Sequence, residues 1–345
     1  MPNPNIFIYT SVFLTSLVIA SFLVPSLRKL AFRLDVIDEP NQTHKTHKEP
    51  VPYLGGLSIV IPVILLSSVG GIFLDGFDNF VKLSLLLFPS LLISAIGFLD
   101  DFSNLPAKTR FIIQLFTSFL VSVLLIESGF MTKLSENRFI DLCVSIFWIV
   151  GLTNAFNFID NLDGGAAGIS FVVAMTIFLL GLMSEQFLIA MLALCIAGAT
   201  LGFLYWNLNP ARIYLGDGGA LFLGIVFSIL LLQFEPETEY QFVSVSIPIL
   251  VLAVPIIDTT VVVISRLLQG KPVYQGGRDH LSHRIQKQGL SRKVTALVLW
   301  IFSSAFSSLG LLANYLQGGA ELCVAIIGFS ILVISIILFL MLRHD

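Results

Sequence analysis

The chain has 345 residues, of which 56% are hydrophobic and 12% are charged, and its mean hydropathy is +0.92. Soluble domains usually carry about a quarter of charged residues, so this composition excludes a soluble globular domain. It predicts an all-α polytopic membrane protein, because helices satisfy their own backbone hydrogen bonds in lipid. The net charge of -3 says little about partners, since the position of each charge along the chain matters more.

Apolar stretches of about twenty residues predict eleven membrane spans. The fifth and eighth are short, which is typical of tilted or partly re-entrant segments. No internal repeat and no separate soluble segment is evident, so we expect residues 1–345 to form a single membrane domain. The predicted spans are 7–27, 54–73, 81–99, 111–126, 139–152, 166–183, 187–205, 220–234, 243–268, 295–315 and 322–342.

The basic residues predict the orientation of these spans. If the first span runs inward, all of the 19 Lys and Arg residues except Lys82, Lys133 and Arg138 lie on the inner side. Inner loops of membrane proteins carry this excess of positive charge, so we expect the amino terminus outside and the carboxyl terminus in the cytoplasm. The same assignment predicts a functional site at the cytoplasmic face, because it places there six carboxylates at the ends of spans: Asp100, Asp101, Asp160, Asp163, Asp217 and Asp279.

Residues 154–165 place two carboxylates and three amides between two long apolar runs. Asp160 and Asp163 are three residues apart, so a helical turn would put both on one face, where like charges repel unless a cation or ligand lies between them. Ionisable residues beside a membrane indicate a functional site.

A second acidic motif, Asp100-Asp101, follows the third span and is followed in turn by Lys108 and Arg110. An adjacent Asp pair in a loop is usually only solvated. Here the pair abuts hydrocarbon, and a carboxylate held near basic partners stays ionised and can act as a base or a metal ligand.

Asp217 lies in the Gly-rich segment Gly216-Asp217-Gly218-Gly219, which opens a predicted helix. A helix amino terminus favours phosphate, but a carboxylate there would repel phosphate unless a divalent ion joined them. Mg²⁺ takes one or two carboxylates together with substrate phosphates. The alternative is that Asp217 is only a helix cap.

Two inner loops carry histidines. The first contains His44, His47 and two lysines, which could grip a phosphate or only anchor the loop to anionic headgroups. The last contains His280 and His283, flanked by arginines, which indicates phosphate recognition or proton handling, with a zinc site as the alternative. Asp258, inside the ninth span, is predicted to pair with a neighbouring element for structure.

Taken together, the motifs resemble those of the polyprenyl-phosphate N-acetylhexosamine-1-phosphate transferases, an integral membrane family. The resemblance covers most of the chain, and its order and spacing are more specific than any one piece. It rests on Pro52-Tyr-Leu-Gly-Gly56, Leu-Asp100-Asp101, Asn154-Ala-Phe-Asn-Phe-Ile-Asp160, Leu-Asp163-Gly, Tyr214-Leu-Gly-Asp217-Gly-Gly, Pro255-Ile-Ile-Asp258 and His280-Leu-Ser-His283-Arg284.

The resemblance implies that a sugar 1-phosphate passes from a UDP-linked N-acetylhexosamine to an undecaprenyl-type lipid phosphate, with release of UMP. It implies Mg²⁺, with Mn²⁺ as the alternative ion, a multi-pass protein of the bacterial inner membrane, a homodimer and no nucleic-acid partner. The implied catalytic residues are Asp100, Asp101, Asp160, Asp163, His280 and His283. The implied substrate-binding residues are Asn157, Leu162, Tyr214, Lys108, Arg110, Arg284 and His47, and the implied metal ligands are Asp217, Asp100 and Asn157.

The motif of the last loop favours the N-acetylglucosamine branch of this family over the alternative, the phospho-N-acetylmuramoyl-pentapeptide transferases of peptidoglycan synthesis. Asn161, Gly165, Ala220 and Ser282 depart from the usual family pattern, which leaves the exact sugar open. A transporter would place its charges near the bilayer midplane and show repeats, and an inactive lipid-binding scaffold would be expected to lose Asp100, Asp101 or Asp217.

Overall fold

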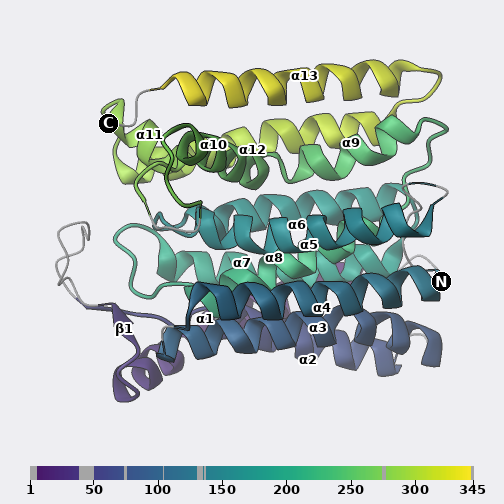
Figure 1. The fold of residues 1–345 in the computed structure, drawn as a ribbon. Coiled ribbons are helices and arrows are strands. Elements are labelled where there is room, and N and C mark those ends of the chain that lie inside the picture. The colour runs from purple at the N-terminus through teal and green to yellow at the C-terminus, as the bar shows by residue number, and fades with distance from the viewer. Residues whose placement is uncertain are drawn as a thin grey trace.

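A computed structural model describes residues 6–38, 50–73, 76–103, 105–129, 135, 137–273 and 277–342. It is a bundle of long, roughly parallel helices, with one short hairpin at the end of the bundle where α1 finishes (Figure 1). The two termini lie at opposite ends of the bundle. The all-helical polytopic fold expected from the composition is therefore confirmed.

The helices and strands follow one another in this order: α1 (Ile6–Arg33), β1 (Ile37–Asp38), β2 (Val51–Pro52), α2 (Leu57–Phe73), α3 (Gly76–Ser103), α4 (Ala107–Ser128), α5 (Arg138–Ile159), α6 (Gly165–Met183), α7 (Phe187–Asn207), α8 (Gly216–Gln233), α9 (Gln241–Val251), α10 (Ala253–Leu268), α11 (Leu281–Lys287), α12 (Arg292–Tyr315) and α13 (Ala320–Met341).

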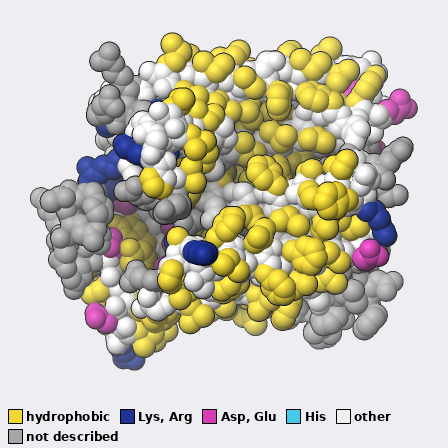
Figure 2. All heavy atoms as spheres, in the orientation of Figure 1, with side chains coloured by type: hydrophobic (Ala, Val, Ile, Leu, Met, Phe, Trp, Pro, Cys, Tyr) yellow, Lys and Arg dark blue, Asp and Glu magenta, His cyan; other side chains and the backbone are white. Residues whose placement is uncertain are grey.

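Nine helices in the described part of the chain are long and apolar enough to cross a membrane, and the bent pair α9 and α10 raises the number to ten at most. The described apolar part of α2, Leu57–Val69, is shorter than the others. The structure therefore supports a polytopic protein, while the count of eleven stays a prediction. In Figure 2 hydrophobic side chains cover the middle of the visible face and charged side chains lie mostly toward its two ends.

The predicted span 243–268 is not one straight helix, which corrects the sequence prediction. It divides into α9 and α10, whose axes differ by 80°. Pro248 lies inside α9, and Pro255 lies in the first turn of α10. Because proline has no N–H to donate and its ring crowds the preceding turn, two prolines seven residues apart favour a break between them.

The two spans expected to be short are also different in the structure. Helix α5 has 22 residues and continues to Ile159, and α8 has 18 residues and begins at Gly216. Both are continuous, so neither is re-entrant. The additional turns carry polar residues, which is why a hydropathy scan ended them early, and they bring Asn157 and Asp217 into helices.

Helix α8 forms the centre of the bundle, since nearly all of its side chains are buried. Its first turn touches α3 and the start of α2 through backbone contacts between glycines. A Cβ on Gly97 would lie 2.6 Å from the Cα of Gly218, and a Cβ on Gly56 would lie 2.3 Å from the Cα of Gly219. No side chain fits at these contacts, so glycine at these positions allows the ends of α3 and α8 to approach each other closely.

Candidate functional site

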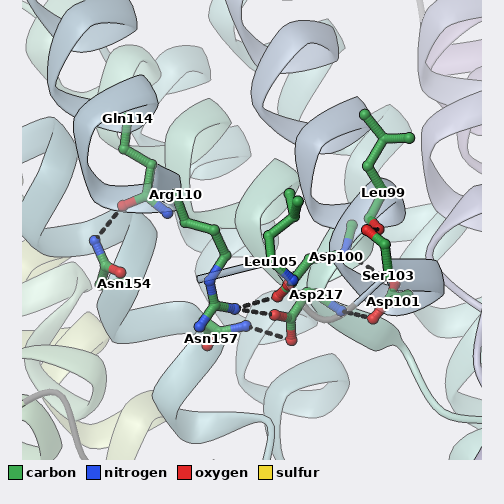
Figure 3. Close-up of polar contacts among 11 residues, drawn as sticks. Leu99, Asp100, Asp101, Ser103, Leu105, Arg110, Gln114, Asn154, Asn157 and Asp217 are labelled. Carbon is green, nitrogen blue, oxygen red and sulfur yellow. Dashed lines mark hydrogen bonds and ion pairs between the residues drawn. The ribbon is translucent and has the colours of Figure 1, made fainter. Parts of the chain in front are cut away.

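Four helices contribute one polar side chain each to a cluster at the same end of the bundle as the β1–β2 hairpin. The guanidinium Nη1 of Arg110 on α4 donates to Oδ2 of Asp100 on α3, and it also donates to Oδ2 of Asp217 on α8 over 2.6 Å. The amide of Asn157 on α5 donates to the other oxygen of Asp217 at 2.9 Å. Figure 3 shows these side chains converging on Asp217. We call Asp100, Arg110, Asn157 and Asp217 the carboxylate cluster.

A second polar contact supports the cluster from behind. The amide of Asn154 donates to the side-chain oxygen of Gln114 over 2.7 Å and to the carbonyl of Val150. Gln114 lies one turn beyond Arg110 on α4, and Asn154 lies three residues before Asn157 on α5. This bond therefore ties α4 to α5 next to the two residues that contact Asp217 (Figure 3).

Asp101 does not point into the carboxylate cluster. Its carboxylate accepts hydrogen bonds from the backbone N–H of Asp217 at 2.9 Å and of Gly218 at 3.3 Å. These are free donors at the amino terminus of α8, the position where the sequence suggested that phosphate would bind. Because Asp101 already fills this anion site, it orients Asp217 and is not placed to act as the base predicted from the sequence.

Gly216 permits this arrangement. Its φ of 77° is in the left-handed region, and a Cβ at this position would lie 2.7 Å from an Asp101 carboxylate oxygen. A side chain would therefore be strained by the backbone and would also push Asp101 away from α8.

A polar cavity of about 500 Å³ opens at the same end of the molecule. It lies between the turn after α5, the Tyr214 segment before α8, and the residues that surround α11. We call this space the polar cavity. Its lining residues are Asp38, Tyr53, Asp160, Asn161, Leu162, Asp163, Asn207, Tyr214, Gly277, Arg278, His283, Gln286, Lys287 and Arg292.

Asp160 connects the carboxylate cluster to the polar cavity. It follows the last residue of α5 and lines the cavity. Loss of hydration raises its pKa well above the usual value, and the charges of Asp217 and Asp101 raise it further. Asn157 of the carboxylate cluster lies three residues before Asp160, and Asp217 lies three residues after Tyr214 of the cavity lining, so the polar cavity and the carboxylate cluster are neighbouring parts of one site.

Asp163 stabilises the walls of the polar cavity. Its Oδ2 accepts from the amide of Asn209 at 2.7 Å and from the backbone N–H of Ala211 at 3.2 Å, while Oδ1 lies 3.9 Å from Arg292. These contacts join the turn between α5 and α6 to the α7–α8 connection and to α12. Asp160 and Asp163 do lie at one site, as the sequence suggested, but Asp163 is nearly fully buried and mainly positions its neighbours.

His283 lines the polar cavity with its pKa lowered to about 4. Burial is the main cause, and the nearby His280 and Arg278 add to it. The imidazole is therefore neutral near pH 7 and acts as a hydrogen-bonding group or proton acceptor. Tyr214 lines the same cavity, and burial raises the pKa of its hydroxyl, so it remains a donor.

His280 is placed differently from His283. Its Nδ1 lies 2.7 Å from Oδ2 of Asp258, and the backbone N–H of Leu281 donates to Oδ1 of Asp258 over 2.6 Å. Both side chains are buried. Asp258 thus pairs with a neighbouring element as predicted, and the pair fixes the start of α11, which in turn presents His283 to the cavity.

The prediction that Arg284 binds phosphate is wrong. Its side chain is fully buried, and it donates to the carbonyls of Asp279, Phe339 and Leu342 and to the hydroxyl of Ser265. Four of its five donors are used inside the protein. Arg284 holds α11 against α10 and α13, because the carbonyls at the end of α13 need donors.

The other predicted residues have varied positions. Leu162 is buried and lines the polar cavity, whereas Lys108 is exposed on α4. Asn157 belongs to the carboxylate cluster and is not among the cavity residues. His47 lies outside the described residues. Two departures from the family pattern meet directly, since the hydroxyl of Ser282 donates to Oδ1 of Asn161 at 2.5 Å.

The donors available in the site decide which metal ion it could hold. In the part of the chain described, no group of three His, Cys, Asp or Glu side chains is arranged to hold a metal ion, which gives no support to the zinc alternative. Mg²⁺ needs fewer protein ligands, since it is commonly bound by one or two carboxylates plus substrate phosphates. Asp100 and Asp217 already hold one cationic group between them, and their hard carboxylate oxygens suit Mg²⁺. The side chain of Asn157 donates to Asp217 through its nitrogen, and it also carries an amide oxygen that could serve as a ligand.

Sequence reasoning missed three kinds of site residue. Gln114 is an isolated amide in an apolar helix. Arg292, which lines the polar cavity, entered only the count of inner charges, whereas Arg278 was expected there as one of the arginines that flank His280 and His283. Arg292 could have been found because Ser291 caps α12 at this position, which places Arg292 at the inner end of a span. Asn207 could not, because its bond to the backbone N–H of Gly164 spans 43 residues.

Comparison with known proteins identifies the family of the chain. A family model described as Glycosyl transferase family 4 matches residues 83–235. A probable undecaprenyl-phosphate N-acetylglucosaminyl 1-phosphate transferase of Bacillus subtilis (strain 168) is 35% identical over 304 residues, covering 86% of this chain and 82% of that protein. The chain is thus an integral membrane member of glycosyl transferase family 4.

More distant relatives belong to a second branch. Phospho-N-acetylmuramoyl-pentapeptide-transferases of Staphylococcus aureus, including strains JH9 and Newman, are 27% identical over 326 residues, or 89% of this chain and 98% of theirs.

The position of Asp101 leads to a prediction on stability. Asp101→Ala should lower the free energy of unfolding by about 1 to 3 kcal/mol, because it leaves two backbone donors of α8 without an acceptor. Asp101→Asn keeps an acceptor oxygen and should lose less than half as much. Unfolding in mixed detergent micelles measures both variants, and equal losses for Asn and Ala would contradict the capping role.

The environment of His283 predicts a pH dependence. Since its pKa is about 4 in the folded protein and about 6.5 when unfolded, the unfolded chain binds more protons between these values. Folding stability should therefore fall as the pH drops from 6.5 toward 4, and His283→Gln should reduce that loss. NMR of histidine-labelled protein should show one resonance titrating near pH 4 that is absent in His283→Gln. Titration near 6.5 would contradict the burial argument.

Proposed function

We propose that the protein transfers N-acetylglucosamine 1-phosphate from its UDP-linked donor to undecaprenyl phosphate and releases UMP. The observation that carries the proposal is the adjacency of the carboxylate cluster and the polar cavity at one end of a membrane bundle, where a soluble donor and a lipid acceptor can meet. The 35% identity to the Bacillus relative favours this sugar over the muramoyl pentapeptide, whose transferases are 27% identical.

The polar cavity suits the sugar nucleotide. Arg278, Lys287 and Arg292 contribute positive charge to its lining, which favours a diphosphate. The rings of Tyr53 and Tyr214 lie 5.8 Å apart and offer aromatic surface for a planar base. Neutral His283 supplies a hydrogen-bonding group that adds no charge near pH 7.

We propose that the reaction depends on Mg²⁺ held by Asp217, Asp100 and Asn157. When bound, the ion would neutralise charge on the diphosphate and orient it. Asp101 would hold Asp217 in place through the first turn of α8, so the ligand and its orienting group come from different helices.

The proposed chemistry is a direct transfer between phosphates. An oxygen of the lipid phosphate forms a bond to the β-phosphorus of the sugar nucleotide, and the bond from that phosphorus to the bridging oxygen breaks, so UMP leaves with the bridging oxygen. Asp100 lies in the last turn of α3 and would accept the proton of a protonated lipid phosphate. Arg110 would stabilise charge on the transferring group.

An apolar groove gives the lipid acceptor a path to the carboxylate cluster. This cavity of about 470 Å³ lies between α5, α8, α9, α10 and α13. Along α5 it extends from Val144 to Ala155, roughly 16 Å at about 1.5 Å per residue, and Ala155 is two residues from Asn157. The 80° bend between α9 and α10 opens this side of the bundle. We propose that a polyprenyl chain occupies the groove.

We further propose eleven membrane spans with the amino terminus outside, the site at the cytoplasmic face of the bacterial inner membrane, and a single domain over residues 1–345. The positive-inside distribution of basic residues supports this orientation. Mn²⁺ as a substitute ion and a homodimer remain predictions from the family resemblance.

The transfer itself is tested by UMP release from purified protein with undecaprenyl phosphate and Mg²⁺. We expect release with UDP-N-acetylglucosamine and none with UDP-N-acetylmuramoyl pentapeptide. Asp217→Asn should lose most turnover, about a hundredfold or more for an electrostatic group at the reacting centre, while its elution profile stays that of the wild type. Release only with the pentapeptide would contradict the proposed donor, and wild-type rates for Asp217→Asn would contradict the metal assignment.

The apolar groove is tested at Gly151, where an added Cβ would meet no described atom within 4 Å. Gly151→Phe should fill the groove and raise the KM for undecaprenyl phosphate about tenfold, leaving the KM for the sugar nucleotide unchanged. Gly151→Ala is the matched control, since a single methyl leaves most of the groove open. If the phenylalanine variant keeps the wild-type KM for the lipid, the polyprenyl chain does not lie in this groove.

A further inference from the structure

Arg110 holds two carboxylates from different helices through one nitrogen. Its Nη1 donates to Oδ2 of Asp100 and to Oδ2 of Asp217. The other oxygen of each carboxylate already accepts a hydrogen bond, from the backbone N–H of Leu105 at 2.5 Å and from the amide of Asn157 at 2.9 Å. The two Oδ2 atoms thus share one cationic group, and its guanidinium nitrogen lies between them (Figure 3).

The bridge is partly buried, which strengthens its electrostatic interactions. The side chain of Asp100 is only 9% exposed, and those of Arg110 and Asp217 are 29% and 31% exposed. Two carboxylates this close repel each other strongly when water is partly excluded, so the site requires positive charge. Arg110 supplies that charge from the first turn of α4, and its long side chain can reorient without moving the helix.

We infer that Arg110 is a built-in counter-ion that occupies the position between Asp100 and Asp217 where the proposed divalent cation would be held, and that its guanidinium would then move onto the diphosphate of the donor. The inference rests on the proposed Mg²⁺-dependent transfer. An ion held by Asp100 and Asp217 would compete with Nη1 for the same two carboxylates, because two cations at hydrogen-bond distance repel each other. A displaced guanidinium forms bidentate bonds with phosphate oxygens.

This exchange couples the ion to the donor. In the absence of a diphosphate, the ion must displace Arg110 into water, which weakens metal binding. With a diphosphate present, the displaced guanidinium gains a new acceptor, and metal binding is therefore stronger. By reciprocity the ion must strengthen donor binding by the same factor. The carboxylate cluster would therefore fill with metal mainly when the donor is present.

The test measures Mn²⁺ binding to purified protein by electron paramagnetic resonance, without sugar nucleotide or lipid phosphate. Arg110→Gln should bind Mn²⁺ about tenfold more tightly than the wild type, because a competing charge is removed from the two carboxylates. Arg110→Lys should stay within about threefold of the wild type. Lys108→Gln is the matched control: it removes a charge two residues away on the exposed side of α4, and it should change the affinity less than about twofold.

Addition of UDP-N-acetylglucosamine should tighten Mn²⁺ binding by the wild type about tenfold and tighten binding by Arg110→Gln much less. The double variant with Asp217→Asn and Arg110→Gln should lose the Mn²⁺ affinity that Arg110→Gln alone gains. This loss would show that the ion binds at Asp217. A gain of affinity cannot arise from misfolding, and Arg110→Met provides the same comparison if the glutamine variant aggregates.

The inference is overturned if Arg110→Gln and Arg110→Met bind Mn²⁺ no more tightly than the wild type, or if Lys108→Gln shows the same gain. These outcomes are distinct from a failure of the proposed function. Failure of the function would appear as an absence of UMP release by the wild type, whereas this comparison uses no turnover.

Discussion

The interaction on which the site depends is the neutralisation of carboxylates at the end of an apolar bundle. Asp100 and Asp217 lie where several helices end together, with limited access to water, and each needs a partner there. Arg110 satisfies both at once, and Asn157 completes Asp217. The glycine contact between Gly97 and Gly218 brings α3 and α8 close enough for one arginine to reach both acids.

Helix α8 links this neutralisation to the polar cavity. Its first turn is capped by Asp101. The segment before it is held by backbone hydrogen bonds to the first loop: the N–H of Tyr214 donates to the carbonyl of Pro52 at 2.9 Å, and the carbonyl of Tyr214 accepts from the N–H of Gly55 at 3.0 Å. The same short stretch therefore places Asp217 in the carboxylate cluster and Tyr214 in the cavity wall. A donor in the cavity and a lipid in the apolar groove along α5 would both approach this one helix end.

The membrane character and the gathering of acids at one end of the bundle were predictable, because composition and charge position follow directly from the physics of the bilayer. The separate structural roles of the individual acidic residues were not predictable. Asp100 and Asp101 are adjacent in the sequence, yet one lies in the carboxylate cluster and the other caps α8. Arg284 has the chemistry of a phosphate ligand, but two of its donors are used by carbonyls 55 and 58 residues away. Such long-range contacts leave no local pattern.

The most direct measurement of the shared bridge is a double-mutant cycle on metal-free protein, with Asp100→Asn, Asp217→Asn and the combined variant unfolded in mixed micelles. Because one guanidinium serves both carboxylates, the two changes should couple by roughly 0.5 to 3 kcal/mol, as residues of one network do. Changes in the free energy of unfolding that add within about 0.3 to 0.5 kcal/mol would show that the two acids do not share Arg110, and would contradict the arrangement from which the site has been built.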